Sequence, residues 1–443
     1  MDSTKMPEPE GDVKKQALDS DIEASLEKPL EKTSTQNAME FPEGGLRAWS
    51  VAIGAGGVLF STFGYANALT YKLIETSVYQ EYYATHQLSH ESPSAISWIG
   101  SLQIFFLFGG NCFGGPLFDR FGAKVIWPSA MAYVLSVMMT SLCKKYYQFM
   151  LAQGVLGGIS MGLTMAPAMA ATGQYFNKKR GAAIGIAVAG SSLGGVIFPI
   201  ALSKLVHNQS IGFGWSIRIL GFMMFALLGP ACIAIRARLP PRTASFFLPS
   251  AFKEITYISL LVASFLMIMG VFMPFFYLPS FAVSKGMSTQ LASYIVSILN
   301  GASFFGRVIP GVLGDKLGRL NALAAAAFAS GILILCMQAI SSNAGIIVFS
   351  ALYGFCSGAI VSGFSTCLAQ IPKDPRNIGT YMGMGMAVIS VAALISPPID
   401  GAIAKQYGGY NQVAIFSGVL VLAGAVATLW VKSTTERGIL GKV

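Results

Sequence analysis

Polar residues recur at helical spacing along an otherwise apolar run between residues 289 and 313. Their intervals place them on one face of a helix: Ser293, Ser297, Asn300, Ser303, Arg307 and Gly311. A charged side chain is costly to bury unless it is paired, and a guanidinium can hold a carboxylate through two parallel hydrogen bonds. We predict that Arg307 binds an anionic group of a ligand, beside Asn300 and Ser303. In the alternative, this guanidinium reaches a membrane interface or bonds backbone carbonyl groups.

Side chains in other apolar runs could contribute to the same chemistry. Asp400 is the one acid inside such a run away from two loops described below. It could carry a proton or pair with a cation; an acid at the membrane interface is the alternative. Polar and aromatic side chains elsewhere could line a cavity or serve only helix packing: Asn67, Asn111, Gln153, Phe276 and Tyr277. The six cysteines show no metal-type spacing, so we predict neither a metal nor another cofactor.

The elements that must position these residues are strongly apolar. Of the 443 residues, 53% are hydrophobic and 11% are charged, whereas a soluble domain has about 25% charged residues. Eleven of the 20 acids precede residue 48, which leaves nine for the rest of the chain. A soluble fold of that size would not leave its surface so uncharged. We therefore predict a membrane protein in contact with the lipid bilayer.

Hydrophobic runs of about 20 residues are long enough to cross the hydrocarbon layer as helices. The runs are continuous and do not alternate in polarity, which favours helices over barrel strands. About twelve are present by this criterion, near 48–68, 94–117, 124–143, 147–170, 180–203, 215–236, 255–282, 289–313, 320–341, 344–368, 378–401 and 411–431. The predicted fold class is an all-α membrane protein with twelve transmembrane helices.

Lysine and arginine gather in alternate loops. If the amino-terminal tail is inside, 22 of the 30 cations lie on that side and six lie outside. Loops rich in Lys and Arg stay in the cytosol, so both termini are predicted to be cytosolic, in a multi-pass protein of the plasma membrane. The net charge of +10 then reflects topology, and no nucleic-acid partner is predicted.

The chain repeats itself at an offset of 196 residues. Gly115–Lys124 is similar to Gly311–Leu320, and the same offset relates Gly158 to Gly354 and Gln174 to Gln370. Two parallel six-helix halves are therefore predicted. The predicted divisions are a disordered cytosolic tail, a first half, a cytosolic linker, a second half and a carboxy-terminal tail, at 1–44, 45–238, 239–253, 254–432 and 433–443.

Small residues dominate the stretch from Tyr175 to Gly195. Gly181 and Gly185 are four residues apart, and so are Gly190 and Gly194, but the two rows point in different directions. Neighbouring helices could then approach this helix closely on more than one side. The cations Lys178–Arg180 are expected to anchor its end to lipid headgroups. Direct substrate contact by this stretch is the alternative.

Several of these motifs resemble those of a known family. The pattern G-x-x-x-D-R-x-G-x-K at Gly115–Lys124 resembles the signature loop of the major facilitator superfamily, and Gly311–Arg319 resembles its second copy. Tyr175–Gly194 resembles the fifth-helix motif of the monocarboxylate porter family, and Glu43–Trp49 resembles its first-helix motif. Pro274–Ala282 and residues 396–403 are similar to its fungal branch. The resemblance covers about residues 41–435 and implies the major facilitator fold.

This resemblance implies gating roles at the two signature loops. Such loops act as latches, in which an acid meets a helix amino terminus and nearby cations and favours one arrangement of the halves. A solvated turn is the alternative. The residues expected to gate are Asp119, Arg120, Asp315, Lys316 and Arg180.

The resemblance also bears on Arg307. The family has an arginine at this position of its eighth helix, which favours anion binding. Its animal members have, four residues earlier, an aspartate used in proton coupling, where this chain has Ser303. Lys72 is not in register with the family's first-helix lysine. Both departures argue against lactate-type transport.

We predict a secondary transporter that works by alternating access and moves a small organic anion or monocarboxylate-type metabolite. A co-transported proton is a possible partner. Export of a secondary metabolite and a non-transporting sensor with the same fold are the alternatives. No GxxxxGK[ST] loop is present, so ATP-driven pumping is not predicted, and neither is an enzyme.

Overall fold

The computed structural model of the chain describes residues 41–70, 83, 86–206, 208, 210–242, 246–435, 438 and 441. The predicted tail lies outside these ranges except for residues 41–44, and so do Lys72 and the rest of 71–75. All the described helices belong to one compact unit, Pro42–Val443. Every regular element in the described ranges is helical, which confirms the predicted fold class.

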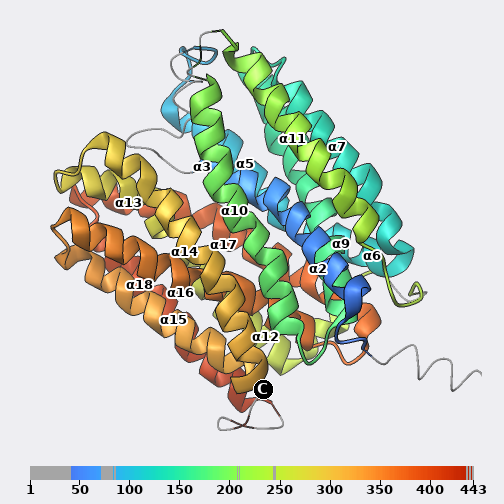
Figure 1. Cartoon of the computed structure of the whole chain (residues 1–443). Coiled ribbons are helices and arrows are strands. Elements are labelled where there is room, and N and C mark those ends of the chain that lie inside the picture. The colour runs from blue at the N-terminus through green and yellow to red at the C-terminus, as the bar shows by residue number, and fades with distance from the viewer. Residues whose placement is uncertain are drawn as a thin grey trace, which may run out of the picture. The chain divides into compact units, whose positions relative to one another are not determined.

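The first half comprises α2 to α11 (Figure 1). Its elements, with η1 and η3 π-helical and η2 a 3₁₀ turn, are α2 Gly45–Leu59, η1 Phe60–Gly64, α3 Tyr65–Thr70, α5 Pro93–Gly109, α6 Asn111–Phe121, η2 Gly122–Val125, α7 Ile126–Thr140, α8 Tyr146–Phe149, η3 Met150–Gly157, α9 Gly158–Tyr175, α10 Arg180–Val206 and α11 Gly212–Ala234.

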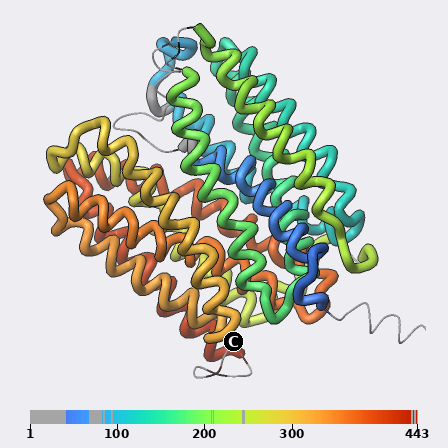
Figure 2. The backbone as a smooth tube through the Cα atoms, viewed as in Figure 1, coloured from blue at the N-terminus to red at the C-terminus, as the bar shows by residue number. Residues whose placement is uncertain are grey.

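The second half comprises α12 to α18 and follows a connection that contains a 3₁₀ turn, η4 Pro249–Lys253. Its elements, with η5 and η6 also 3₁₀, are α12 Ile255–Val271, α13 Met273–Ser284, α14 Thr289–Leu317, α15 Arg319–Cys336, η5 Met337–Ala339, α16 Asn343–Gln370, η6 Pro375–Asn377, α17 Ile378–Tyr407 and α18 Asn411–Ser433. Figure 2 shows the two halves as a blue-to-green part and a yellow-to-red part.

Eleven helical stretches in the described residues are long and apolar enough to cross a membrane, and one of them, Ala95–Thr140, has 46 residues. This stretch reverses at Gly122, where φ is 68°. A Cβ added at Gly157 would lie 3.6 Å from Gln103 of α5 and 3.1 Å from Ser136 of α7. The two parts of the stretch are thus at the same depth, and it makes two crossings. The total agrees with the predicted twelve.

Local signals in the sequence set several helix boundaries. Ser92, Ser288 and Ser342 precede α5, α14 and α16, and each side chain accepts a hydrogen bond from a backbone N–H of the first turn. Such caps satisfy donors that have no partner inside the helix. The seventh crossing is interrupted at Phe272, between α12 and α13, just before Pro274, whose ring disfavours a continuous helix.

The most extensive packing between the halves is of α10 against α14 and of α6 against α17, and α5 also packs against α17 and α10 against α16. In Figure 1, α10 and α14 run close together toward the lower end. The two glycine rows of α10 meet different neighbours. A methyl group at Gly181 or Gly185 would overlap backbone carbonyl groups of α14, and one at Gly190 or Gly194 would overlap those of α2 and η1. This confirms that neighbours approach the helix closely on two sides.

Candidate functional site

The end of the bundle at which α6 and α14 finish and α10 and α17 begin is called the latch end below. Here Asp119, which is 4% exposed, reaches from α6 to the first turn of α17. Its carboxylate accepts hydrogen bonds from the backbone N–H groups of Gly379 and Thr380, at 3.1 and 2.6 Å, and from the Thr380 hydroxyl at 2.7 Å. An acid at a helix amino terminus satisfies free donors and opposes the helix dipole. The contact therefore joins the two halves.

Asp315 makes the equivalent contact in the opposite direction. Its carboxylate, at the end of α14, accepts hydrogen bonds from the backbone N–H groups of Gly181 and Ala182 in the first turn of α10, at 2.8 and 2.9 Å. Arg319 donates from Nε to the same carboxylate at 2.9 Å. The repeat found in the sequence is thus matched by a repeat in the contacts.

Arg319 and Arg180 each form a hydrogen bond between the halves at the latch end. Arg319 donates to the Gln370 side chain at 3.0 Å and to the carbonyl oxygen of Asn177. Arg180 donates to the carbonyl oxygens of Phe176, at 2.8 Å, and of Ala369 in α16, at 2.9 Å. Arg319 is not among the residues predicted to gate, although its position four residues after Asp315 is a recognisable helix-pair spacing.

The expectation that Lys178–Arg180 binds lipid headgroups is wrong for Arg180. Its side chain is buried, while Lys178 and Lys179 are exposed. The reason is that the guanidinium bonds carbonyl groups at the ends of two helices, α9 and α16, where the helix dipole is negative.

Arg120 and Lys316, the other expected gating residues, are exposed. The Arg120 guanidinium lies 5.8 Å from the ring centre of Phe121, its neighbour in the chain. In the two latches, the carboxylates of Asp119 and Asp315 accept the hydrogen bonds instead, and Arg319 donates to Asp315. A gating role for Arg120 and Lys316 therefore stays a prediction.

Glu43, just before α2, binds the loop between α9 and α10. Its carboxylate accepts hydrogen bonds from three consecutive backbone N–H groups, those of Asn177, Lys178 and Lys179, at 2.7–3.1 Å. Its own φ is 54°, a left-handed conformation that is uncommon outside glycine. The sequence pattern at Glu43–Trp49 marked this region but not this contact.

The loop before α17 contains an ion pair near the surface. Arg376 donates to Asp374 at 3.0 Å. Partial burial acts to raise the pKa of the Asp374 carboxyl, but the hydrogen bonds from Arg376 outweigh it, and the pKa lies below its usual range. Arg376 is the repeat counterpart of Arg180, and its exposure shows that the two latches are not identical.

The central part of the polar row of α14 is buried inside the protein. Asn300, Ser303 and Arg307 are at most 2% exposed. Arg307 donates to the carbonyl oxygen of Val188 at 2.8 Å and to the Ser191 hydroxyl, both in α10. In this conformation α10 packs directly over the guanidinium. The alternative in which it bonds a backbone carbonyl is the observed one.

Asn300 lies seven residues before Arg307 on the face of α14 that packs against α10; this α10–α14 contact is called the seam below. Its amide donates to the Val296 carbonyl at 3.1 Å. Its side-chain oxygen is buried without a hydrogen-bond partner among the described residues and would lie 2.8 Å from a Cβ at Gly195 of α10. Ser303 instead points toward Gly358 of α16, inside the second half. The row is therefore divided between two neighbouring helices.

The remaining predicted lining residues lie on elements other than α10 and α14. Asn111 bonds the Leu107 carbonyl of its own helix stretch at 2.6 Å. Gln153 accepts from the Tyr83 hydroxyl at 2.9 Å and lies 3.3 Å from Gln103. Asn67 is buried at 6% exposure. These three residues belong to the first half.

In the second half, Tyr277 and Phe276 of α13 are partly exposed. The Tyr277 hydroxyl lies 3.4 Å from the carbonyl oxygen of Pro397 in α17. Asp400 is fully buried nearby, 3.4 Å from the Ser396 hydroxyl and 3.3 Å from that of Ser417 in α18. Hydroxyl groups alone are weak partners for a buried carboxylate.

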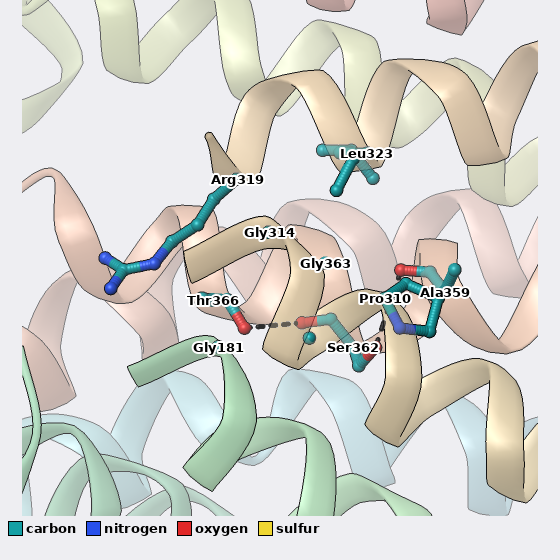
Figure 3. A pocket seen from close by; sticks show the side chains of 11 residues that line it. Gly181, Pro310, Gly314, Arg319, Leu323, Ala359, Ser362, Gly363 and Thr366 are labelled. Carbon is teal, nitrogen blue, oxygen red and sulfur yellow. Dashed lines mark hydrogen bonds between the residues drawn. The ribbon is translucent and has the colours of Figure 1, made fainter. Parts of the chain in front are cut away.

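A small cavity lies at the latch end (Figure 3), lined from α14 and α16 by Pro310, Gly314, Ala359 and Ser362, and by Gly181 of α10. Its volume is about 20 Å³, which suits about one water molecule and no organic cargo. Within the described ranges, no three His, Cys, Asp or Glu side chains are grouped so as to hold a metal ion.

Two repeated halves of transmembrane helices, joined at one end by reciprocal acid-to-helix contacts, define a membrane protein of the secondary-transporter class. Comparison with known families agrees. The Major Facilitator Superfamily model matches residues 51–375 and 308–442, and the chain belongs to this superfamily.

Its relatives include fungal efflux proteins. The aspyridones efflux protein apdF of Emericella nidulans is 54% identical over 398 residues, which cover 90% of this chain and 80% of that protein. The agnestins efflux protein AgnL12 of Paecilomyces divaricatus is 40% identical and covers 96% of this chain and 98% of its own length. Among solved structures, the fucose transporter FucP in the outward conformation has a TM-score of 0.68 at 14% identity, covering 87% of this chain and 99% of FucP. At that identity the likeness concerns the fold.

Proposed function

We propose that this chain exports a small secondary metabolite across the plasma membrane by alternating access. The observation that carries the proposal is the 54% identity to an aspyridones efflux protein over 90% of the chain, supported by similarity to an agnestins efflux protein. Of the functions predicted from sequence, these relatives favour export of a secondary metabolite over uptake or release of a monocarboxylate. The resemblance to the monocarboxylate porter family stays a prediction.

The latch end faces the cytosol in this proposal, with both termini on that side. The excess of Lys and Arg in the latch-end loops supports this orientation. The hydrogen bonds of Asp119 and Asp315 then close the cytosolic side, and the cargo would leave from this state. To load cargo, the latch acids must release the first turns of α17 and α10.

Arg307 has a state-dependent role in this cycle. In the closed state α10 supplies a carbonyl and a hydroxyl group to the guanidinium. When α10 and α14 separate, the guanidinium loses these acceptors, and an acidic or carbonyl group of the cargo replaces them. Asn300, with a buried side-chain oxygen on the same seam, would then accept a hydrogen bond from the cargo. A cargo held in this way is released when α10 returns.

A proton is the proposed counter-ion, with Asp400 as its carrier. The carboxyl group is fully buried, has hydroxyl neighbours on α17 and α18, and forms no ion pair with another described residue. Protonation removes the cost of burying a charge there. Entry of a proton from outside could thus accompany the outward movement of cargo.

The test compares metabolites in cells and medium. A producing strain is grown with the gene intact, deleted, restored, and restored as Arg307→Gln at equal protein level. We expect one family of compounds to accumulate in deleted cells, fall in their medium, and return to the medium only with the unaltered chain. Equal distributions in the intact and deleted strains would falsify the export proposal. Full restoration by Arg307→Gln would contradict the role of Arg307 alone.

A further inference from the structure

The contact of Asp119 with α17 is called the first latch, and that of Asp315 with α10 the second latch. The two latches differ at the fourth residue after the acid. Four residues after Asp315 stands Arg319, whose guanidinium bonds that acid and crosses to the other half. Four residues after Asp119 stands Ala123, which has no charge and cannot make either contact. The first latch therefore lacks the cation that its repeat counterpart contains.

An arginine from outside the signature loop lies at this place. Arg242, in the connection between α11 and α12, donates its backbone N–H to the carbonyl oxygen of Asp119 at 2.8 Å. Its guanidinium donates to the Asn377 side chain at 2.8 Å and to the carbonyl oxygen of Phe246 at 3.2 Å. The residue is 6% exposed, which is unusual for an arginine in a connecting segment.

Two of these partners, Asp119 and Asn377, belong to the first latch. Asp119 lies in the last turn of α6, and Asn377 is the cap residue of α17, two residues before the first of the two backbone N–H groups that donate to the Asp119 carboxylate. One residue thus contacts both sides of the same closure. The connection also packs over the turn after Asp119, since a Cβ at Gly122 would lie 3.4 Å from Ala237.

We propose that Arg242 is a positioning residue of the first latch, which supplies from the inter-half connection the cation that Ala123 does not provide. The connection is then part of the gate and not only a tether. The Arg242 guanidinium holds the amino terminus of α17 where Asp119 can reach it. This hydrogen bond must break when the latch end opens. The inference rests on the alternating-access part of the proposed function and not on the cargo.

The test measures the distance between the halves without cargo. Arg47 and Lys373 are exposed at the latch end on opposite halves, and spin labels on cysteines at these two positions, in a full-length chain freed of its own cysteines, report whether the end is closed. A charge-assisted hydrogen bond is a strong one, so Arg242→Ala should raise the ratio of open to closed molecules about tenfold. Arg319→Ala, at the second latch, is the matched control and should act similarly.

Rescue separates this role from simple structural support. Ala123→Arg places a cation four residues after Asp119, as in the second latch, and should return the Arg242→Ala distribution most of the way to the closed state. Arg242→Lys should retain more closure than Arg242→Gln. If the distance between the labels stays short in Arg242→Ala but lengthens in Arg319→Ala, the inference is overturned and alternating access is not. The inference is also overturned if Arg242→Ala lengthens the distance and adding Ala123→Arg does not shorten it again. Distances that stay short in every variant overturn alternating access and the inference with it.

Discussion

The glycine seam between the halves gives a prediction with a magnitude. A Cβ at Gly311 of α14 would lie 2.5 Å from the carbonyl oxygen of Gly181 in α10, too close for either backbone to remain in place. Overpacking of this kind costs about 1–3 kcal/mol. The higher helix propensity of alanine stabilises α14 equally in the open and closed states and does not enter their ratio. Gly311→Ala should therefore disfavour the closed state by about 1–3 kcal/mol, about a 5- to 150-fold change in the ratio of states.

Two matched variants make this prediction specific. Gly301→Ala is on the same helix with nothing within 4 Å of the added Cβ, and Gly158→Ala would lie 2.7 Å from the Gln103 carbonyl oxygen inside the first half. Measured between labels on residues 47 and 373, only Gly311→Ala should lengthen the distance. Gly158→Ala should instead lower the unfolding temperature in detergent. If Gly311→Ala and Gly301→Ala give the same distance distribution, the seam does not set the closed state.

Three further outcomes are expected. Glu43→Gln should speed hydrogen exchange at amides 177–179 by about 10- to 100-fold, because hydrogen bonds to a charged acceptor contribute about 1.5–3 kcal/mol; unchanged exchange at these amides would contradict the cap. Arg307→Lys keeps the charge but loses the planar donor geometry, so it should reduce export into the medium more than about tenfold. Export equal to that of the unaltered chain would contradict cargo binding by the Arg307 guanidinium. Asp400→Asn should leave export that no longer responds to a proton gradient in reconstituted vesicles, and a retained response would exclude this carboxyl as the carrier.

The helices and their spacing could be predicted because lipid leaves the backbone few choices. A segment without water must satisfy its own N–H and C=O groups, so each long apolar run became a helix with ends close to those expected. The glycine rows of α10 were predictable for a similar reason. Small residues at intervals of four have few uses other than close approach, and Gly185 and Gly190 meet different helices.

Partners across long separations could not be predicted. The sequence requires that Arg307 be sheltered, but nothing in it selects Val188, 119 residues earlier, as the acceptor. Arg180 was assigned to headgroups because it follows two lysines, and only the fold shows that two helix ends provide carbonyl groups for it. Arg242 gave no signal, since its role depends on where the connection between the halves passes over the first latch.

The interface between the halves combines glycine contacts along α10 and α14 with hydrogen bonds at the latch end, and the two contribute differently to closure. Backbones that meet through glycine interdigitate little, so the seam along α10 and α14 resists separation less than a packed core would. Closure then depends largely on the hydrogen bonds of Asp119, Asp315 and the nearby arginines. A transporter must populate both states, so this closure has to be offset to within a few kcal/mol. Cargo that replaces Val188 and Ser191 on Arg307 offers such an offset, since it stabilises the open state only while it is bound.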